Sequence, residues 1–243
     1  MFEPPLALAS LSGQSDAQWA IDGSPWAGMA FLGGVALDDP TREAARAMVA
    51  HRDRSEFLPA DPIAFIEAQL DRLGEVDIRA GFNVRAVADE PLRRAASTCA
   101  ARDAVLELNA HCRQPEMTDL GAGQALLRDP DRLAHQVGVA SDAGATVSVK
   151  VRTEVPGVDL PALSETLVAA GADILHVDAM DSEAVVGAIA DRTDAVILAN
   201  NGVRDRATVQ EYLAYGADAV SLARPSDDPA VLERVHAAVT DAA

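Results

Sequence analysis

Lysine is almost missing from this chain of 243 residues, since only one of its 20 Lys and Arg side chains, Lys150, is a lysine. Asp and Glu together number 38, which gives a formal net charge of −18. Such a charge repels nucleic acids and anionic membranes unless basic side chains gather locally, so neither DNA nor a membrane is expected as a partner. An acidic, lysine-poor surface is also typical of proteins that stay soluble in concentrated salt, and we interpret the composition as halophilic.

Cysteine, aromatic residues and long apolar runs are also scarce. Cys99 and Cys112 are the two cysteines, and they form no CxxC or Cys/His spacing, so the sequence predicts neither a disulfide framework nor a metal site. No apolar run reaches the roughly 18 residues that cross a bilayer, and the N-terminus lacks the pattern of a secretion signal. We therefore expect a cytoplasmic protein. Although only 4% of the residues are aromatic, 49% are hydrophobic, which is enough for a sizeable core.

Short apolar runs alternate with amphipathic stretches of helical length, which is the pattern of repeated βα units. A doubly wound open sheet shares this pattern, but no GxGxxG motif follows the first expected strand. Eight units of about 30 residues fill the chain, which favours a single (βα)8 TIM barrel over residues 1–243. The expected strands are Pro5–Ser10, Met29–Leu37, Val76–Asn83, Ala104–Ala110, Thr146–Arg152, Asp173–Asp178, Ala195–Asn200 and Ala217–Ala223.

Helix start and stop signals separate these strands. Asp38-Asp39-Pro40, Asp61-Pro62 and Asp129-Pro130-Asp131 predict helix N-termini, because a capping carboxylate followed by proline suits the first turn of a helix. Gly171 and Gly216 each follow an apolar periodic stretch and precede a strand, so they predict helix C-termini.

Active sites of TIM barrels lie at the C-terminal ends of the strands, so polar residues at those ends are the first candidates for function. The candidates are Ser10, Asn83, Asn109, Cys112, Lys150, Arg152, Asp178, Asn200, Asn201 and Arg224.

Lys150 is the most informative of these candidates. Alternation within Thr146–Arg152 places residues 148, 150 and 152 on one face, and we expect that face to point into the mouth of the barrel. A lysine there needs a compensating negative charge. A barrel carboxylate or an anionic ligand could supply it, and the avoidance of lysine elsewhere in the chain favours the ligand.

Other strand ends also suggest chemistry. Cys112 lies between His111 and Arg113 after the fourth expected strand, where a thiol is placed for reactivity or proton transfer, although these residues alone favour a chance loop cysteine. Asn200-Asn201-Gly202 and Arg224 end the seventh and eighth strands, where barrels commonly bind phosphate groups. Ordinary turn chemistry explains the Asn-Gly pair but not the arginine.

Several segments, taken in order, resemble the motifs of tRNA-dihydrouridine synthases, which are FMN-dependent TIM barrels related to dihydroorotate dehydrogenases. The likeness is strongest from about residue 104 to residue 226, and Leu8–Gly13 faintly resembles the first-strand flavin motif. The chain ends one helix after the eighth expected strand, so it resembles a short form that lacks the C-terminal helical domain of the synthases. The segments that carry the resemblance are Asn109–Cys112, Gly121–Pro130, Val149–Arg152, Ala199–Gly202 and Ala217–Arg224.

The resemblance implies an FMN-dependent oxidoreductase that acts on CH–CH bonds and belongs to tRNA processing. Hydride would pass from flavin N5 to the C=C bond of a pyrimidine-like substrate, free or in RNA, with Cys112 as the proton donor and Asn109 beside it. A reduced nicotinamide or another donor would supply the electrons, and Arg152 and Asp178 would contact the substrate. The residues implied to bind FMN are Ala9, Ser10, Lys150, Asn200, Asn201, Gly202, Ala223 and Arg224.

The chain departs from the family pattern at two places. The usual Gly-Cys-Pro is His111-Cys112-Arg113 here, and Asp178 replaces the histidine of the sixth strand, with His176 two residues earlier on the same face. Two alternatives therefore remain open. One is a small-molecule flavoenzyme of the dihydroorotate dehydrogenase type, and the other is a barrel that binds flavin or phosphate without catalysis.

Overall fold

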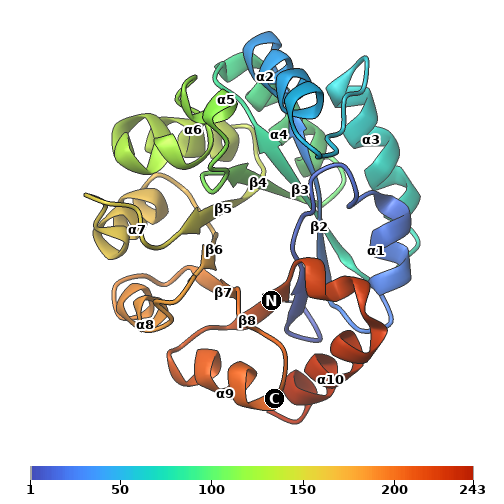
Figure 1. Ribbon diagram of the computed structural model, residues 1–243, viewed down its shortest axis with the longest axis vertical. Helices are drawn as coiled ribbons and strands as arrows, with labels where there is room; N and C mark the ends of the chain where they lie inside the picture. Colours follow the sequence, from blue (N-terminus) through green and yellow to red (C-terminus); the bar gives the residue numbers. More distant parts are fainter. Residues whose placement is uncertain (1, 243) are drawn as a thin grey trace.

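Eight parallel strands close into a barrel in the computed structural model, which describes residues 2–242 (Figure 1). The strands follow one another around the ring in chain order, and β1 completes it by pairing with β8. The TIM barrel predicted from the sequence is therefore confirmed. The strands are β1 (Leu6–Leu8), β2 (Met29–Ala36), β3 (Arg79–Arg85), β4 (Val105–Asn109), β5 (Thr146–Arg152), β6 (Ile174–Asp178), β7 (Val196–Asn200) and β8 (Ala219–Leu222).

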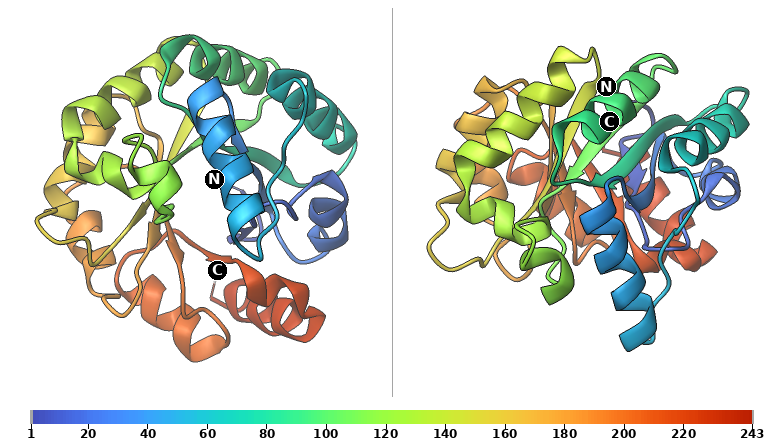
Figure 2. Two further views of the ribbon diagram at one scale, coloured as in Figure 1. Left: turned by 45° about the horizontal axis from the view of Figure 1, so that its top comes forward. Right: turned by 90° about the horizontal axis from the view of Figure 1, so that it is seen from above.

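Helices surround the barrel as an outer ring (Figures 1 and 2). The predicted helix starts are confirmed, because the carboxylates of Asp38, Asp61 and Asp129 accept backbone N–H groups of the first turn. No helix within residues 2–242 is long and apolar enough to cross a membrane. The α-helices are α1 (Ala17–Gly23), α2 (Asp39–His51), α3 (Pro62–Leu73), α4 (Asp89–Ala100), α5 (Pro115–Thr118), α6 (Pro130–Asp142), α7 (Leu160–Ala169), α8 (Val185–Ala190), α9 (Arg206–Ala214) and α10 (Pro229–Thr240), and the 3₁₀ helices are η1 (Gly123–Arg128) and η2 (Arg224–Asp227).

The strand bounds follow the sequence closely, with one shift. β5 has the expected bounds, whereas β3 starts and ends later than the expected Val76–Asn83. Val76 and Ile78 form backbone hydrogen bonds of turns instead of ladder bonds. At the other end, Arg85 pairs with Ala36 of β2 after a bulge in β2. The shift places Arg85 at the C-terminal end of the barrel, a position that the sequence analysis did not assign to it.

Side chains that point into the barrel change character along the strands. On β6 the successive inward positions are Ile174, His176 and Asp178, which are apolar, polar and charged. The inward positions of the barrel form an apolar layer near the N-terminal ends of the strands and a buried polar layer above it, and β3, β5 and β6 add charged side chains at their C-terminal ends. The apolar layer comprises Phe2, Ala7, Met29, Phe31, Val105, Ile174, Leu198 and Ala219.

The connection between β2 and β3 forms one side of the barrel opening. It contains both α2 and α3, and α2 extends away from the barrel before the chain returns (Figure 2). On the return, Phe57 forms a bridge with Val35, and Arg54 Nη2 donates a hydrogen bond of 2.7 Å to Ser12 Oγ. Residues 53–55 consequently lie beside the strand ends, where function is expected.

Candidate functional site

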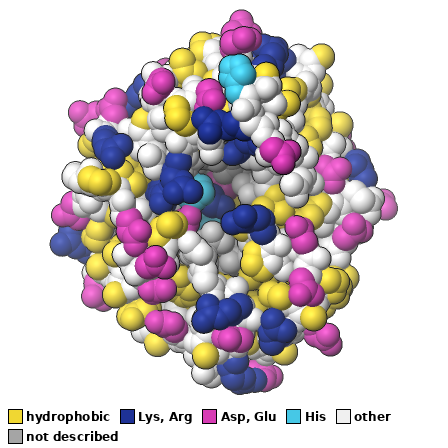
Figure 3. All heavy atoms as spheres, viewed as in Figure 1, with side chains coloured by type: hydrophobic (Ala, Val, Ile, Leu, Met, Phe, Trp, Pro, Cys, Tyr) yellow, Lys and Arg dark blue, Asp and Glu magenta, His cyan; other side chains and the backbone are white. Residues whose placement is uncertain are grey.

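A deep pocket of about 990 Å³ opens at the C-terminal end of the barrel. Figure 3 shows the hollow near the centre of this face, with Lys or Arg side chains and a histidine at its rim. Ligand pockets usually have volumes of about 300 to 1,000 Å³, so this one is large enough for a cofactor together with a small substrate.

Ten of the twelve site residues predicted from the sequence line this pocket. Ala9 does not, because it is fully buried and its backbone N–H donates to the Leu222 carbonyl at 2.7 Å. Arg152 is not among the lining residues either, and its Nε is 3.5 Å from the Thr153 carbonyl. The roles assigned to these two residues remain predictions. The ten lining residues are Ser10, Asn109, Cys112, Lys150, Asp178, Asn200, Asn201, Gly202, Ala223 and Arg224.

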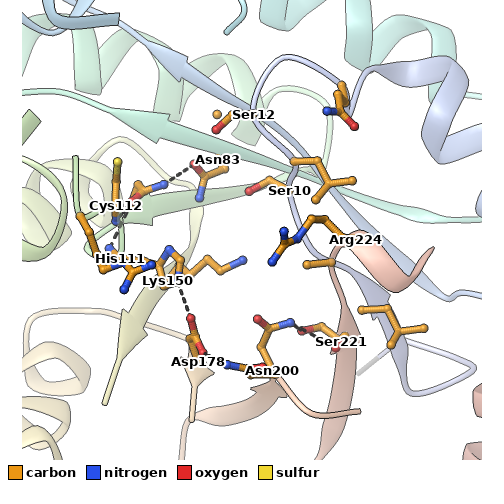
Figure 4. Close-up of a pocket in the computed structure, with 18 of the residues that line it drawn as sticks. Ser10, Ser12, Asn83, His111, Cys112, Lys150, Asp178, Asn200, Ser221 and Arg224 are labelled. Atoms are coloured by element: carbon orange, nitrogen blue, oxygen red, sulfur yellow. Dashed lines mark hydrogen bonds and ion pairs between the residues drawn. The ribbon is translucent and has the colours of Figure 1, made fainter. Parts of the chain in front are cut away.

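Lys150 extends from β5 into the pocket (Figure 4). The residue is 4% exposed, and its ammonium group forms no hydrogen bond or salt bridge with any residue from 2 to 242. Burial lowers the pKa of Lys150, while the charges of Glu107 and Asp178 act in the opposite direction. A largely buried lysine whose ammonium opens into the pocket without a partner favours an acceptor group supplied from the pocket.

Glu107 is the centre of the polar layer beneath the pocket. Its Oε1 accepts a hydrogen bond of 2.7 Å from Asn83 Nδ2, and its Oε2 faces His176 Nδ1 at 2.6 Å and Ser148 Oγ at 3.2 Å. Burial alone would raise the pKa of Glu107, but its neighbours, His176 foremost, lower it overall. The layer therefore holds a buried carboxylate in its ionised form.

Hydrogen bonds connect this layer to both walls of the pocket. On one side, Asn109 Nδ2 donates to Asn83 Oδ1 at 2.9 Å. On the other side, His176 Nε2 lies 2.8 Å from Ser221 Oγ, which also accepts from Asn200 Nδ2 at 2.7 Å. These bonds fix the orientations of Asn109 and Asn200, two of the predicted site residues.

Cys112 lies at the edge of the pocket and is 8% exposed. Its side chain belongs to an apolar cluster that includes Met48 and Met117, and its sulfur points away from Lys150 in Figure 4. Gly123 packs against the same loop, because a Cβ at that position would lie 2.4 Å from the Cys112 carbonyl oxygen. The glycine-rich segment Gly121–Gly123 therefore packs closely against the loop that carries Cys112.

His111 is a site residue that the sequence analysis did not select. Its Nε2 is hydrogen-bonded to Asp178 Oδ2 (Figure 4). Asn201 Nδ2 donates to Asp178 Oδ1 at 3.0 Å. Burial alone would raise the pKa of Asp178, but the hydrogen bonds from His111 and Asn201 lower it to about 2. Burial lowers the pKa of His111 below its usual value, although Asp178 opposes this shift. Asp178 is therefore a carboxylate, and His111 a neutral imidazole, at pH 7.

The ends of β7 and β8 form another wall of the pocket. Asn201 and Gly202 both have left-handed backbone conformations, with φ of 84° and 68°. The Tyr212 hydroxyl holds this turn by donating a hydrogen bond of 2.8 Å to the Asn201 carbonyl. Arg224 is exposed, and its side chain forms no hydrogen bond or salt bridge within residues 2–242. This wall therefore offers a free guanidinium group.

A buried ion pair that the sequence analysis missed lies on the opposite wall. Arg85 Nη2 donates to the Gly34 carbonyl at 2.8 Å and to the carboxylate of Glu56, which also binds Arg54 Nε at 2.6 Å. The side chains of Arg85 and Glu56 are 1% and 0% exposed. Gly34 leaves no room for a side chain, since a Cβ would lie 2.5 Å from Asn83 Oδ1. This pair fixes the segment between α2 and α3 against the strand ends.

The pocket is basic although the protein as a whole is acidic. Within residues 2–242, no group of three or more His, Cys, Asp or Glu side chains could hold a metal ion. A basic pocket in a protein of net charge −18 concentrates anionic ligands. The charged lining residues are Arg54, Arg85, Arg113, Lys150 and Arg224 against Asp53 and Asp178.

Solved structures with the same fold have low sequence identity to this chain. FabK from Thermotoga maritima is 14% identical with a TM-score of 0.61, over 93% of this chain and 59% of FabK, so this chain spans less than two thirds of FabK. Morphinone reductase in complex with tetrahydroNAD is 14% identical with a TM-score of 0.64, over 96% of this chain and 87% of the reductase. A chain of the tryptophan synthase complex from Pyrococcus furiosus is 11% identical with a TM-score of 0.62, over 99% of this chain and 100% of the synthase chain. These likenesses support the barrel fold.

Sequence comparison is more specific. An uncharacterized protein of Methanocaldococcus jannaschii is 28% identical over 232 residues, which cover 90% of this chain and 88% of the relative. The family model described as dihydrouridine synthase matches residues 82–243, which begin within β3 and include β4 to β8 and most of the pocket lining. Because this match covers well over half of the sequence, the chain belongs to the dihydrouridine synthase family.

Proposed function

We propose that this protein is an FMN-dependent oxidoreductase that reduces a carbon–carbon double bond in a pyrimidine-like ring. Membership of the dihydrouridine synthase family supports a flavin-dependent oxidoreductase. The observation that carries the proposal is Lys150, the single lysine of the chain, whose ammonium group enters the pocket without a partner among residues 2–242. A cation in this position stabilises the negative charge of a reduced flavin.

The pocket residues fit a flavin mononucleotide. A volume of about 990 Å³ accommodates the ring system, and the free ammonium of Lys150 suits the carbonyl groups of its pyrimidine edge. The free guanidinium of Arg224 and the left-handed turn at Asn201 and Gly202 suit its phosphate group. We assign cofactor binding to Ala9, Ser10, Lys150, Asn200, Asn201, Gly202, Ala223 and Arg224.

The bound flavin would supply hydride chemistry, and the protein would supply the proton that completes the reduction. The family pattern assigns this proton to Cys112, on the loop after β4. Asn109 holds that loop, because its Oδ1 accepts the backbone N–H of Cys112 at 2.9 Å. Asp178 lines the pocket beside this loop and orients His111, so we assign it to the substrate side of the pocket, with Arg152 as a neighbouring positive charge behind the lining.

The basic lining of the pocket supports ligands that carry negative charge. Besides the phosphate of FMN, a pyrimidine nucleotide or a uridine in RNA has this character, and so does a reduced nicotinamide cofactor as the electron donor. A pyrimidine-like substrate, free or in RNA, is therefore part of the proposal.

The visible absorption spectrum of the purified protein tests the cofactor. We expect a flavin spectrum and the release of FMN on heating. Lys150→Ala should weaken FMN binding about tenfold or more, a loss of about 1.4 kcal/mol. Arg94→Ala, a change of an exposed residue on α4, is the matched control and should not alter binding. A colourless protein that takes up no added FMN would overturn the proposal.

A further inference from the structure

We propose that His111 and Asp178 form a proton-transfer pair in which His111 Nδ1 accepts a proton from a substrate carbon next to a carbonyl group. The inference rests on the proposed function, because it names the group that exchanges the proton in the same pocket. In this inference His111, and not Cys112 as in the family pattern, exchanges the proton with the substrate carbon.

The pair is held rigidly by two strand ends. Asp178 is the last residue of β6, and His111 lies in the loop after β4. Both oxygens of the carboxylate are occupied, since Oδ2 faces His111 Nε2 and Oδ1 accepts from Asn201 Nδ2 at 3.0 Å and from the Met180 backbone N–H at 3.3 Å. The carboxylate cannot turn without losing these bonds, so it fixes the plane of the imidazole ring.

The orientation of the ring determines which nitrogen is reactive. A carboxylate only accepts hydrogen bonds, so the proton of the neutral imidazole lies on Nε2 and the lone pair on Nδ1. Nδ1 has no hydrogen-bond partner among residues 2–242, and the side chain is 31% exposed in the pocket. A carboxylate that orients an imidazole while its other nitrogen faces the substrate is the arrangement of a general base.

The charges around His111 keep it neutral. Burial has the largest effect and lowers the pKa of His111, and the positive charges of Lys150 and Arg152 on β5 lower it further. Asp178 on β6 raises it, while His176, on the same strand, is buried and has a lowered pKa of its own. The net shift is downward, so His111 is ready to accept a proton at pH 7.

The proton step balances without any other reactant. The C–H bond of the substrate breaks, the proton bonds to His111 Nδ1, and the electron pair spreads onto the carbonyl oxygen. In the direction of reduction, the imidazolium returns the proton to the same carbon. Cys112 is less suited to this exchange, because its thiol is part of the apolar cluster and points away from Lys150 (Figure 4).

Imidazole NMR tests the pair directly. In protein labelled with ¹⁵N-histidine, which has five histidines, His111→Gln identifies the signals of His111. We expect a neutral ring at pH 7, protonated on Nε2, with a titration midpoint below the usual 6.5. Asp178→Asn should lower the midpoint further, because the carboxylate stabilises the charged ring. A proton on Nδ1, or an imidazolium at pH 7, would overturn the assignment.

Proton exchange tests the chemistry separately from the cofactor. The probe is 5,6-dihydrouracil in D₂O, whose C5 carbon lies next to a carbonyl group, and NMR follows the loss of the C5 proton signal with and without added FMN. His111→Gln should slow exchange about 10²- to 10⁴-fold. His135→Gln is the matched control and should exchange at the wild-type rate, since His135 forms an exposed pair with Asp89 at 2.8 Å and neither residue lines the pocket.

The outcomes separate this inference from the proposed function. Absence of exchange in the wild-type protein, or wild-type exchange in His111→Gln, overturns the role of His111. Loss of exchange in Cys112→Ala combined with retention in His111→Gln returns the proton step to the thiol. Failure to bind FMN with exchange intact overturns the proposed cofactor and leaves the proton-transfer pair in place.

Discussion

Replacing Glu107 by glutamine should destabilise the barrel, because this buried carboxylate joins three other strands. It is bound by Asn83 of β3 at 2.7 Å, Ser148 of β5 at 3.2 Å and His176 of β6 at 2.6 Å. Glutamine keeps one acceptor oxygen for Asn83 but presents an NH₂ group to the other two. The variant also removes the negative charge that most strongly raises the pKa of Lys150.

The size of the effect follows from these losses. A hydrogen bond to a charged group contributes about 1.5–3 kcal/mol, and removing one partner from a buried ionic group costs about 3–5 kcal/mol. Because the amide keeps part of the bonding, we expect a loss of about 3 kcal/mol in the free energy of unfolding. For a chain of this length, about 2–4 °C of Tm corresponds to each kcal/mol, so Tm should fall by about 6–12 °C.

Urea and thermal unfolding at pH 7, followed by circular dichroism at fixed salt, measure this loss. The pKa of Glu107 is lowered in the folded protein, so its contribution is complete above the usual value of 4.5 and disappears as the pH falls through the folded pKa. The difference between wild type and variant should therefore shrink in acid. Glu43→Gln is the control, because Glu43 is 77% exposed. A loss of less than about 1 kcal/mol at pH 7 would refute the reasoning.

Three further predictions concern the cofactor, the surface and the Cys112 loop. Arg224→Ala should weaken FMN binding in a titration and leave riboflavin binding unchanged; equal weakening would remove Arg224 from the phosphate site. The urea midpoint should rise with KCl concentration, since salt screens the repulsion within a protein of net charge −18, and an unchanged midpoint contradicts the halophilic interpretation. Gly123→Ala should lower the urea midpoint more than Gly157→Ala, because both have positive φ but only Gly123 lacks room for a Cβ; equal losses contradict this packing.

Much of the barrel and part of the site could be predicted from the sequence. Alternation within β5 predicted that Lys150 faces the barrel opening, because side chains of a strand alternate whatever the rest of the fold does. The position of Arg224 after β8 was equally predictable from the general location of sites in TIM barrels. Both inferences needed only local spacing and the order of the strands.

Pairs between distant segments could not be predicted in the same way. His111 and Asp178 are 67 residues apart, and no local pattern in the sequence pairs them, because Asp178 stands out as a polar residue at a strand end and His111 only as a departure from the family pattern. Taken together, the two departures could have suggested the pair. Asp178 stands where the family pattern has a histidine on β6, and His111 introduces a histidine after β4, where the pattern has a glycine. Glu56 gave no signal, because residues 51–60 have no periodic pattern and nothing in the sequence pairs that carboxylate with Arg85 of β3.

The hydrogen-bonded polar layer limits how this pocket could change during evolution. Asn83, Glu107, His176 and Ser221 come from four different strands, and each satisfies a polar group of another. A substitution in one of them leaves a buried polar atom of its neighbour unsatisfied, so single changes there should be selected against. New substrates would be reached more easily through exposed residues of the pocket lining such as Asp53 and Arg113, whose side chains form no hydrogen bond or salt bridge within residues 2–242. We therefore expect relatives of different specificity to share the interior layer and to differ at these exposed positions.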